Sequence, residues 1–112
     1  MAACQRKPDL VILPKVKSAG EVRIYDKLIS QRNANPKLMM IIESSSGILN
    51  PGTIVSTSLR MTCLTLGNAD LSAELGSQTS WEAMYAYRAA IIAACGLKGV
   101  TPVDSPYINI RD

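Results

Sequence analysis

The stretch LMMIIESSSGILNP, residues 38–51, decides how this sequence folds, because a continuous apolar run ends there abruptly on a carboxylate. Five aliphatic or thioether residues precede Glu43, and three serines and a glycine follow it. Such a run is typical of a strand buried on both faces of a parallel sheet. Glu43 is then either the first residue to reach water or a functional group at the mouth of the sheet.

Three further apolar runs of the same character occur along the chain, and helix start and stop signals separate them, as parallel strands require. Together the four runs cover residues 9–16, 38–43, 61–67 and 99–104. The helix signals are Ser18 with Glu21, Asn50 with Pro51, a short turn closed by Gly76, and a capping box from Thr79 to Glu82 that leads toward Gly96.

The order β-α-β-α-β-α-α-β predicts an α/β fold with parallel strands and right-handed crossover helices. Two architectures fit: a small open sheet, or part of an eight-stranded TIM barrel, which needs about 250 residues when whole. The 112 residues suit one small domain, 1–112, with about four such strands. In both architectures ligands gather where the strands end, here at residues 15–17, 43–47, 67–70 and 104–112.

Composition excludes several classes of function. The chain has no histidine, which excludes Ser-His-Asp and Cys-His nucleophile systems and removes the commonest zinc ligand. The net charge is only +3 and the basic residues are scattered, so nucleic acid is not an expected partner. No apolar run reaches the ~20 residues of a membrane span, and residues 1–9 lack the apolar stretch of a secretory signal. We expect a cytoplasmic protein, or one of a mitochondrial or other organelle matrix, with no membrane partner.

Cysteines, aromatic residues and methionines are expected to serve packing. The three cysteines are widely spaced, which suits reduced thiols, and Cys63 and Cys95 are interpreted as small core residues. Arg88 has two alternatives, facing solvent or facing a neighbouring subunit. The other residues expected to pack are Tyr25, Trp81, Tyr85, Tyr87, Met39, Met40, Met61 and Met84.

Two carboxylates, Glu43 and Asp70, follow consecutive predicted strands. Neighbouring strand ends lie about 5 Å apart, so both side chains can reach one point, where two anions repel unless a cation lies between them. Mg²⁺ fits, since one or two carboxylates often hold it while water and substrate oxygens fill its other positions. The alternatives are a solvated Glu43 and an Asp70 that caps the following turn. Backbone amides at Gly47, Gly67 and the SSSG and GN segments are candidates for binding a substrate carboxylate.

Four segments together resemble the HpcH/HpaI aldolase/citrate lyase family, and above all its citrate lyase beta-subunit-like branch. IIESSSGILN is similar to the family's IET-x-x-G-x-x-N segment, and LTLGNADLSAELG is similar to its G-x-x-D-L-x-x-x-L/M-G segment. LVILPKV resembles the strand before them, and GVTPVDSPYINIRD resembles the strand after them. The four motifs stand in the family's order and cover nearly the whole chain.

The resemblance implies a partial (β/α)₈ TIM barrel in which this chain matches roughly strands four to seven. It implies Mg²⁺ at Glu43 and Asp70, as catalytic residues and metal ligands, with Gly67, Asn68 and Ala69 lining the substrate site. Family members cleave or condense carbon–carbon bonds of 3-hydroxy acids, often as coenzyme A thioesters of citramalyl, malyl or citryl type, through a metal-stabilised enolate. The implied partners are such a small-molecule substrate and further copies of the chain in a trimer or hexamer.

Several departures from the family pattern favour an alternative function. Lys17 stands where the family usually has Glu, Ser44 and Ser45 replace Thr-Ala, and Asn109 replaces an Asp. The family's first three strands, with an acidic DLED-like segment and the arginine that holds the substrate carboxylate, have no counterpart, and neither has its eighth strand. The alternative is a truncated, non-catalytic fragment or assembly partner that keeps the fold segment and metal binding. A nucleotide-binding open sheet is not favoured, because LPKVKSAGE lacks the G-x-G-x-x-G loop.

Overall fold

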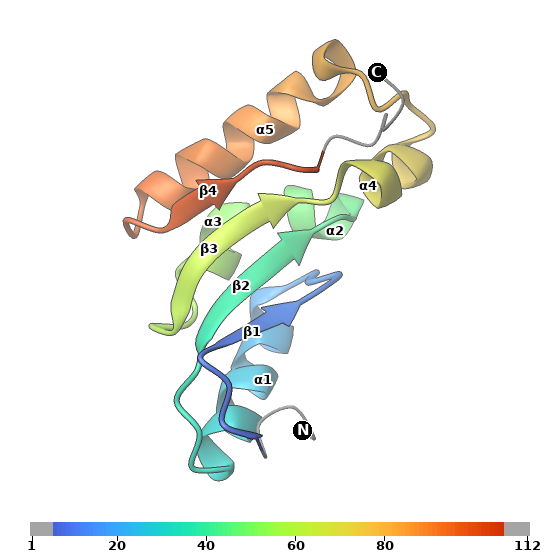
Figure 1. The fold of residues 1–112 in the computed structure, drawn as a ribbon. Helices are drawn as coiled ribbons and strands as arrows, with labels where there is room; N and C mark the ends of the chain where they lie inside the picture. The colour runs from blue at the N-terminus through green and yellow to red at the C-terminus, as the bar shows by residue number, and fades with distance from the viewer. Residues whose placement is uncertain (1–5, 107–112) are drawn as a thin grey trace.

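The computed structural model describes residues 6–106, which form a curved parallel sheet with helices packed behind it (Figure 1). Predictions about Cys4 and the tail 107–112, including Asn109, concern residues outside this range. The sheet has the order β1-β2-β3-β4, and every neighbouring pair is parallel. Its strands are β1 (Leu10–Leu13), β2 (Lys37–Ile42), β3 (Met61–Leu66) and β4 (Thr101–Val103). The predicted fold of four parallel strands with crossover helices is therefore confirmed.

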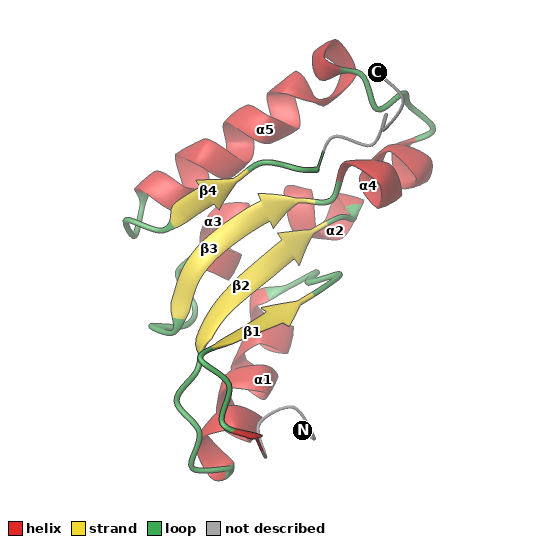
Figure 2. Ribbon diagram, viewed as in Figure 1, coloured by secondary structure: helices red, strands yellow, loops and turns green. Residues whose placement is uncertain are grey.

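Five helices connect these strands, one more than the sequence signals predicted (Figure 2). They are α1 (Ala19–Gln31), α2 (Ser45–Ile48), α3 (Pro51–Val55), α4 (Asn68–Leu75) and α5 (Trp81–Gly96). The unpredicted helix is α2, a single turn that begins at the serines after Glu43. Within residues 6–106, no helix combines the length and apolar character that crossing a membrane requires.

The predicted start of α1 is confirmed in one of its two hydrogen bonds. Ser18 Oγ accepts from the Glu21 backbone N–H at 3.3 Å, as expected of an N-cap. The Glu21 carboxylate, however, accepts from the Lys17 N–H at 2.8 Å instead of bonding back to Ser18. The start of α3 differs in a similar way: Pro51 occupies its first turn as predicted, but the Asn50 side chain makes no capping bond.

The capping residue predicted for α5 was wrong by one position. Ser80, not Thr79, is the N-cap, and its Oγ accepts from the Ala83 N–H at 3.2 Å. The helix begins at Trp81, so Ala83 is the third helical residue and Glu82 lies one residue too early to complete a capping box. Both Thr79 and Ser80 can cap a helix, so the residue types alone did not decide between them.

The core lies between the sheet and its helices. Alternate residues of β2, Leu38, Met40 and Ile42, are fully buried against the helix layer, while Met39 and Ile41 on the opposite face are partly exposed. The prediction of burial on both faces was therefore wrong within residues 6–106, because the helices cover only one face of the sheet there (Figure 2). The same core cluster includes buried side chains from other elements, among them Val22, Ile29, Ile54, Leu64, Met84 and Ile91.

Most of the predicted packing residues are in this core. Tyr25 and Tyr87 pack against it, and Met40, Met61 and Met84 are buried within it. Cys95 is buried too, and this burial raises the pKa of its thiol, with a smaller contribution from Cys63, so the thiolate is disfavoured. Trp81 and Tyr85 were predicted wrongly, since both are more than half exposed at the start of α5.

A charged cluster ties α1 to the loop before β3 at the N-terminal edge of the sheet. Arg60 Nε donates to Asp26 Oδ1 at 2.8 Å, and its other nitrogens donate to Asn35 Oδ1 and Ser30 Oγ. Ser58 Oγ donates to the same Asp26 oxygen at 3.1 Å. One guanidinium therefore links α1 and the loop that follows it to the loop before β3.

We expect Asp26→Ala to lower the free energy of unfolding by about 1–2 kcal/mol, because it leaves the Arg60 and Ser58 donors without their shared acceptor. This range allows for solvent screening, since the Asp26 side chain is 36% exposed. Urea unfolding measures the change. Asp9→Ala, the same loss of charge in the loop before β1, is the control and should stay within about 0.5 kcal/mol of the parent. Equal losses in both variants would contradict a specific role for Asp26.

Candidate functional site

Glu43 is placed by the pairing of β2 with β3. The Gly67 N–H donates to the Ile42 carbonyl at 2.8 Å, which sets Gly67 beside Glu43 at the carboxyl ends of the two strands. A Cβ on residue 67 would lie 2.6 Å from Glu43 Cβ and 2.7 Å from Glu43 Oε1. The bare backbone at Gly67 is therefore what allows the Glu43 side chain to lie across the end of β3.

Lys15 contacts both predicted acids. It follows β1 with a φ of +56°, a left-handed conformation that costs a residue with a side chain roughly 1 kcal/mol or more. Its backbone N–H donates to Glu43 Oε2 at 2.9 Å, and its Nζ lies 3.9 Å from Asp70 Oδ2. Residues 15–17 were predicted to lie at a strand end, but these contacts were not predictable, because no local pattern encodes a bond across 28 residues.

Asp70 was predicted to follow the end of a strand. In the structure it is instead the third residue of α4. It does not cap that helix either, because the N-cap position belongs to Gly67. The first turn of α4 nevertheless brings the carboxylate back to the edge of the sheet where Glu43 lies, as their shared contacts with Lys15 indicate. A carboxylate in the first turn is also favoured by the helix dipole.

An open cleft of about 960 Å³ lies at this edge and unites the predicted site. The predicted metal ligands and the predicted substrate-site residues all line it, namely Glu43, Gly67, Asn68, Ala69 and Asp70. The loop before α5 and the segment after β4 form its other walls. The cleft therefore meets the expectation that ligands bind at the carboxyl ends of parallel strands.

The serine segment after Glu43 has a structural role that was not predicted. The Gly47 N–H donates to Ser44 Oγ at 3.2 Å, and the Ser45 N–H donates to Glu74 Oε2 at 2.9 Å. A Cβ at Gly47 would lie 2.7 Å from the Val16 carbonyl oxygen, so this glycine serves close packing. The predicted anion site at SSSG is therefore wrong for these amides, which cap α2 and join it to α4.

The oxygens of the cleft fit a hard divalent cation such as Mg²⁺. Residues 6–106 contain no group of three or more Asp, Glu, His and Cys side chains arranged to hold a metal ion. Mg²⁺ does not require such a group, because one or two carboxylates can hold it while water and substrate oxygens fill its other positions. Asn68 supplies a further observation, because its Oδ1 is buried beside the cleft without a hydrogen-bond partner. Glu43 and Asp70, with Asn68 adjacent, are the residues that could hold the ion.

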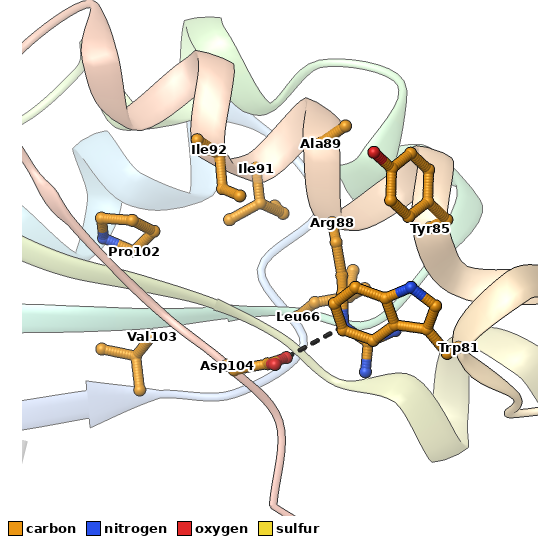
Figure 3. A pocket seen from close by; sticks show the side chains of 10 residues that line it. All are labelled: Leu66, Trp81, Tyr85, Arg88, Ala89, Ile91, Ile92, Pro102, Val103 and Asp104. Carbon is orange, nitrogen blue, oxygen red and sulfur yellow. Dashed lines mark hydrogen bonds and ion pairs between the residues drawn. The ribbon is translucent and has the colours of Figure 1, made fainter.

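Arg88 lines both the cleft and a second, apolar pocket of about 380 Å³. Figure 3 shows Arg88 among the residues that line the second pocket. Its side chain is only 16% exposed, its Nε donates to Asp104 Oδ1 at 3.0 Å, and its Cζ lies 4.6 Å from the centre of the Trp81 ring. Of the two alternatives left open for Arg88, facing solvent is therefore excluded. The partly exposed Trp81 ring is explained by the same contact, because it covers the guanidinium.

Asp104 is held as an anion at the end of β4. The Ser105 backbone N–H donates to its Oδ1 at 2.7 Å and is the main cause of a lowered carboxyl pKa, to which the Arg88 guanidinium also contributes. Partial desolvation opposes this lowering. Arg88 and Asp104 therefore form a fixed ion pair at the rim of the cleft.

The family model for HpcH/HpaI aldolase/citrate lyase matches residues 1–112 of this sequence. The chain belongs to the HpcH/HpaI aldolase/citrate lyase family. One curated relative, an L-malyl-CoA/beta-methylmalyl-CoA lyase from Cereibacter sphaeroides, is 30% identical over 129 residues. That match covers 93% of this chain but 41% of the relative, so the chain spans about two fifths of the relative's length.

Solved structures agree with this family fold. RipC from Yersinia pestis superposes with a TM-score of 0.90 at 31% identity, covering 97% of this chain and 50% of RipC. Protein CitE from Mycobacterium tuberculosis, solved in complex with magnesium and acetoacetate, superposes with a TM-score of 0.74 at 22% identity. The latter match covers 93% of this chain and 43% of CitE. The four strands of this HpcH/HpaI family chain thus correspond to part of a barrel of the TIM type.

Proposed function

We propose that this chain carries the metal and substrate-carboxylate site of a Mg²⁺-dependent carbon–carbon lyase acting on a 3-hydroxy acid or its coenzyme A thioester. The observation that carries the proposal is the convergence of Glu43 and Asp70 on one cleft with the start of α4. The lyase named among the curated relatives supports the substrate class, and the magnesium in the CitE structure supports the metal.

Glu43 and Asp70 are the proposed ligands, and each brings one negative charge to the cleft. Bound there, Mg²⁺ would supply a Lewis acid that neutralises negative charge developing on a substrate oxygen as the carbon–carbon bond breaks. The Lys15 N–H limits rotation of the Glu43 carboxylate by holding Oε2 at 2.9 Å. Glu43 is thereby oriented in the absence of the ion.

The start of α4 is the proposed site for the substrate carboxylate. Gly67, Asn68 and Ala69 line the cleft there, and the first N–H groups of a helix have no intrahelical partners. These donors and the positive end of the helix dipole favour an anion.

Metal removal tests the catalytic proposal on the 112-residue chain. We expect cleavage of malyl-CoA into glyoxylate and acetyl-CoA with Mg²⁺, and a loss of at least about 100-fold when EDTA replaces the metal, since a Lewis acid supplies several kcal/mol of charge stabilisation. Chromatography of the thioesters, with a carbonyl reagent for glyoxylate, measures both products. Free coenzyme A and malate in their place would instead indicate thioester hydrolysis and contradict the lyase.

A second candidate is a non-catalytic, metal-binding assembly piece of the same fold. It is favoured by one observation, that the helices in residues 6–106 cover only one face of the sheet. A Mg²⁺-dependent rise in thermal stability without turnover of malyl-CoA would support this candidate against the lyase. Association into a trimer or hexamer stays a prediction under both candidates, and analytical ultracentrifugation measures it.

A further inference from the structure

Lys15 connects the two proposed metal ligands through two different chemical groups. Its backbone N–H donates to Glu43 Oε2 at 2.9 Å, and its ammonium lies 3.9 Å from Asp70 Oδ2. The left-handed backbone at Lys15, with φ of +56°, accompanies this arrangement. The next residue anchors the loop to the sheet, because the Val16 N–H donates to the Ile41 carbonyl at 3.2 Å.

The two contacts have opposite consequences for a metal ion. The N–H of Lys15 has no net charge and orients one Glu43 oxygen, which leaves the other oxygen of that carboxylate for a further ligand. The ammonium carries a full positive charge and lies 3.9 Å from Asp70, the second proposed ligand of the ion. A divalent cation and an ammonium repel each other, so both cannot lie close to Asp70 without a cost.

We infer that Lys15 is an internal counter-ion of this site, which neutralises Asp70 while the metal is absent and has to be displaced when the metal binds. The inference rests on the proposed function, because it assumes that Glu43 and Asp70 hold the ion. Its consequence is that Lys15 lowers the affinity for Mg²⁺, while its backbone keeps Glu43 oriented.

The Lys15 ammonium can move away from Asp70 at little energetic cost. The Lys15 and Asp70 side chains are 69% and 55% exposed, and at 3.9 Å the pair is at the long end of an ion-pair contact. Exposed pairs of this kind contribute little, so displacing the ammonium does not prevent metal binding. The remaining effect is repulsion by one partly screened charge, for which we expect a change of about 3- to 10-fold in the Mg²⁺ dissociation constant.

Calorimetric Mg²⁺ titration of the full chain at fixed ionic strength tests the inference. We expect Lys15→Met and Lys15→Asn to bind Mg²⁺ about 3- to 10-fold more tightly than the parent. Asn tolerates the left-handed conformation and keeps the N–H, so it provides a second variant should Met perturb the loop. Lys15→Arg keeps the charge and should restore the parent affinity.

Lys98→Met is the matched control, because it removes the same charge from an exposed turn before β4, at the opposite edge of the sheet. It should change the affinity less than about 2-fold. Unchanged or weaker binding in both neutral Lys15 variants, with binding still lost in Glu43→Gln, would overturn the counter-ion role and leave the metal site standing. Absence of Mg²⁺ binding in every variant, the parent included, would overturn both the inference and the proposed site.

Discussion

Replacing Glu43 with glutamine is expected to abolish the stabilisation of this chain by Mg²⁺ and to reduce lyase activity below detection. Loss of a residue that merely supports a metal ligand typically costs about 10- to 100-fold in affinity, so loss of a ligand itself should cost at least about 100-fold. The substitution preserves shape, and the amide oxygen can still accept from the Lys15 N–H, which donates to Glu43 Oε2 at 2.9 Å.

Thermal unfolding measures this effect without an assay of turnover. At Mg²⁺ ten times above its dissociation constant, a single site stabilises the folded chain by about 1.4 kcal/mol, a Tm rise of about 5–10 °C for a domain of this size. Glu43→Gln should show no rise. Glu82→Gln makes the same chemical change in the first turn of α5 and should keep the parent response. A preserved Mg²⁺ shift in Glu43→Gln would exclude Glu43 as a ligand.

Replacing Gly67 with alanine should damage stability and the site together. The added Cβ would lie 2.6 Å from Glu43 Cβ, and neither atom is the end of a flexible side chain. Relief of this contact requires the paired ends of β2 and β3 to separate, and such overpacking costs about 1–3 kcal/mol. The added Cβ would also lie 2.7 Å from Glu43 Oε1, so the carboxylate has to turn away as well. A turned Glu43 loses its bond from the Lys15 N–H, so the Mg²⁺ response should weaken as well.

Gly20 provides a control, because its replacement by alanine is expected to stabilise the fold. A Cβ at Gly20, in the first turn of α1, would meet only Ser18 Oγ at 3.7 Å. Gly20→Ala should therefore raise the free energy of unfolding, by up to about 1 kcal/mol, because alanine favours the helix. Urea unfolding with and without Mg²⁺ measures both variants. A stable Gly67→Ala chain with an intact Mg²⁺ response would show that the close contact with Glu43 is not a constraint.

The existence, type and order of the strands were predictable because each apolar run is continuous and is bounded by turn or cap residues. Local signals failed where two similar residues compete. Thr79 and Ser80 are both residues that cap helices, and the structure has α5 begin at Trp81 with Ser80 as its cap. The single turn of α2 was missed because four residues, Ser45–Ile48, are too few for a periodic pattern.

The acidic residues of the candidate site were predictable from the sequence, whereas the contacts of its basic residues were not. Glu43 and Asp70 stand out because each follows an apolar run at the position where parallel strands present ligands. Lys15 does not stand out, since its role depends on the conformation of one loop residue and on the strand register that brings Glu43 beside it. Arg88 points inward because Asp104 and Trp81 surround it, and these residues lie 16 and 7 positions away.

The sequence by itself determined the parallel α/β fold, the order of its elements and the two carboxylates at the end of the sheet, because hydrophobic periodicity and helix signals act over neighbouring residues. The tertiary structure alone decided which groups meet those carboxylates. It brings the Lys15 N–H to Glu43 and the Lys15 ammonium to Asp70, and it requires glycine at position 67. The physical reason is that such contacts depend on strand register and loop conformation, which the packing of the whole sheet sets and no short segment encodes.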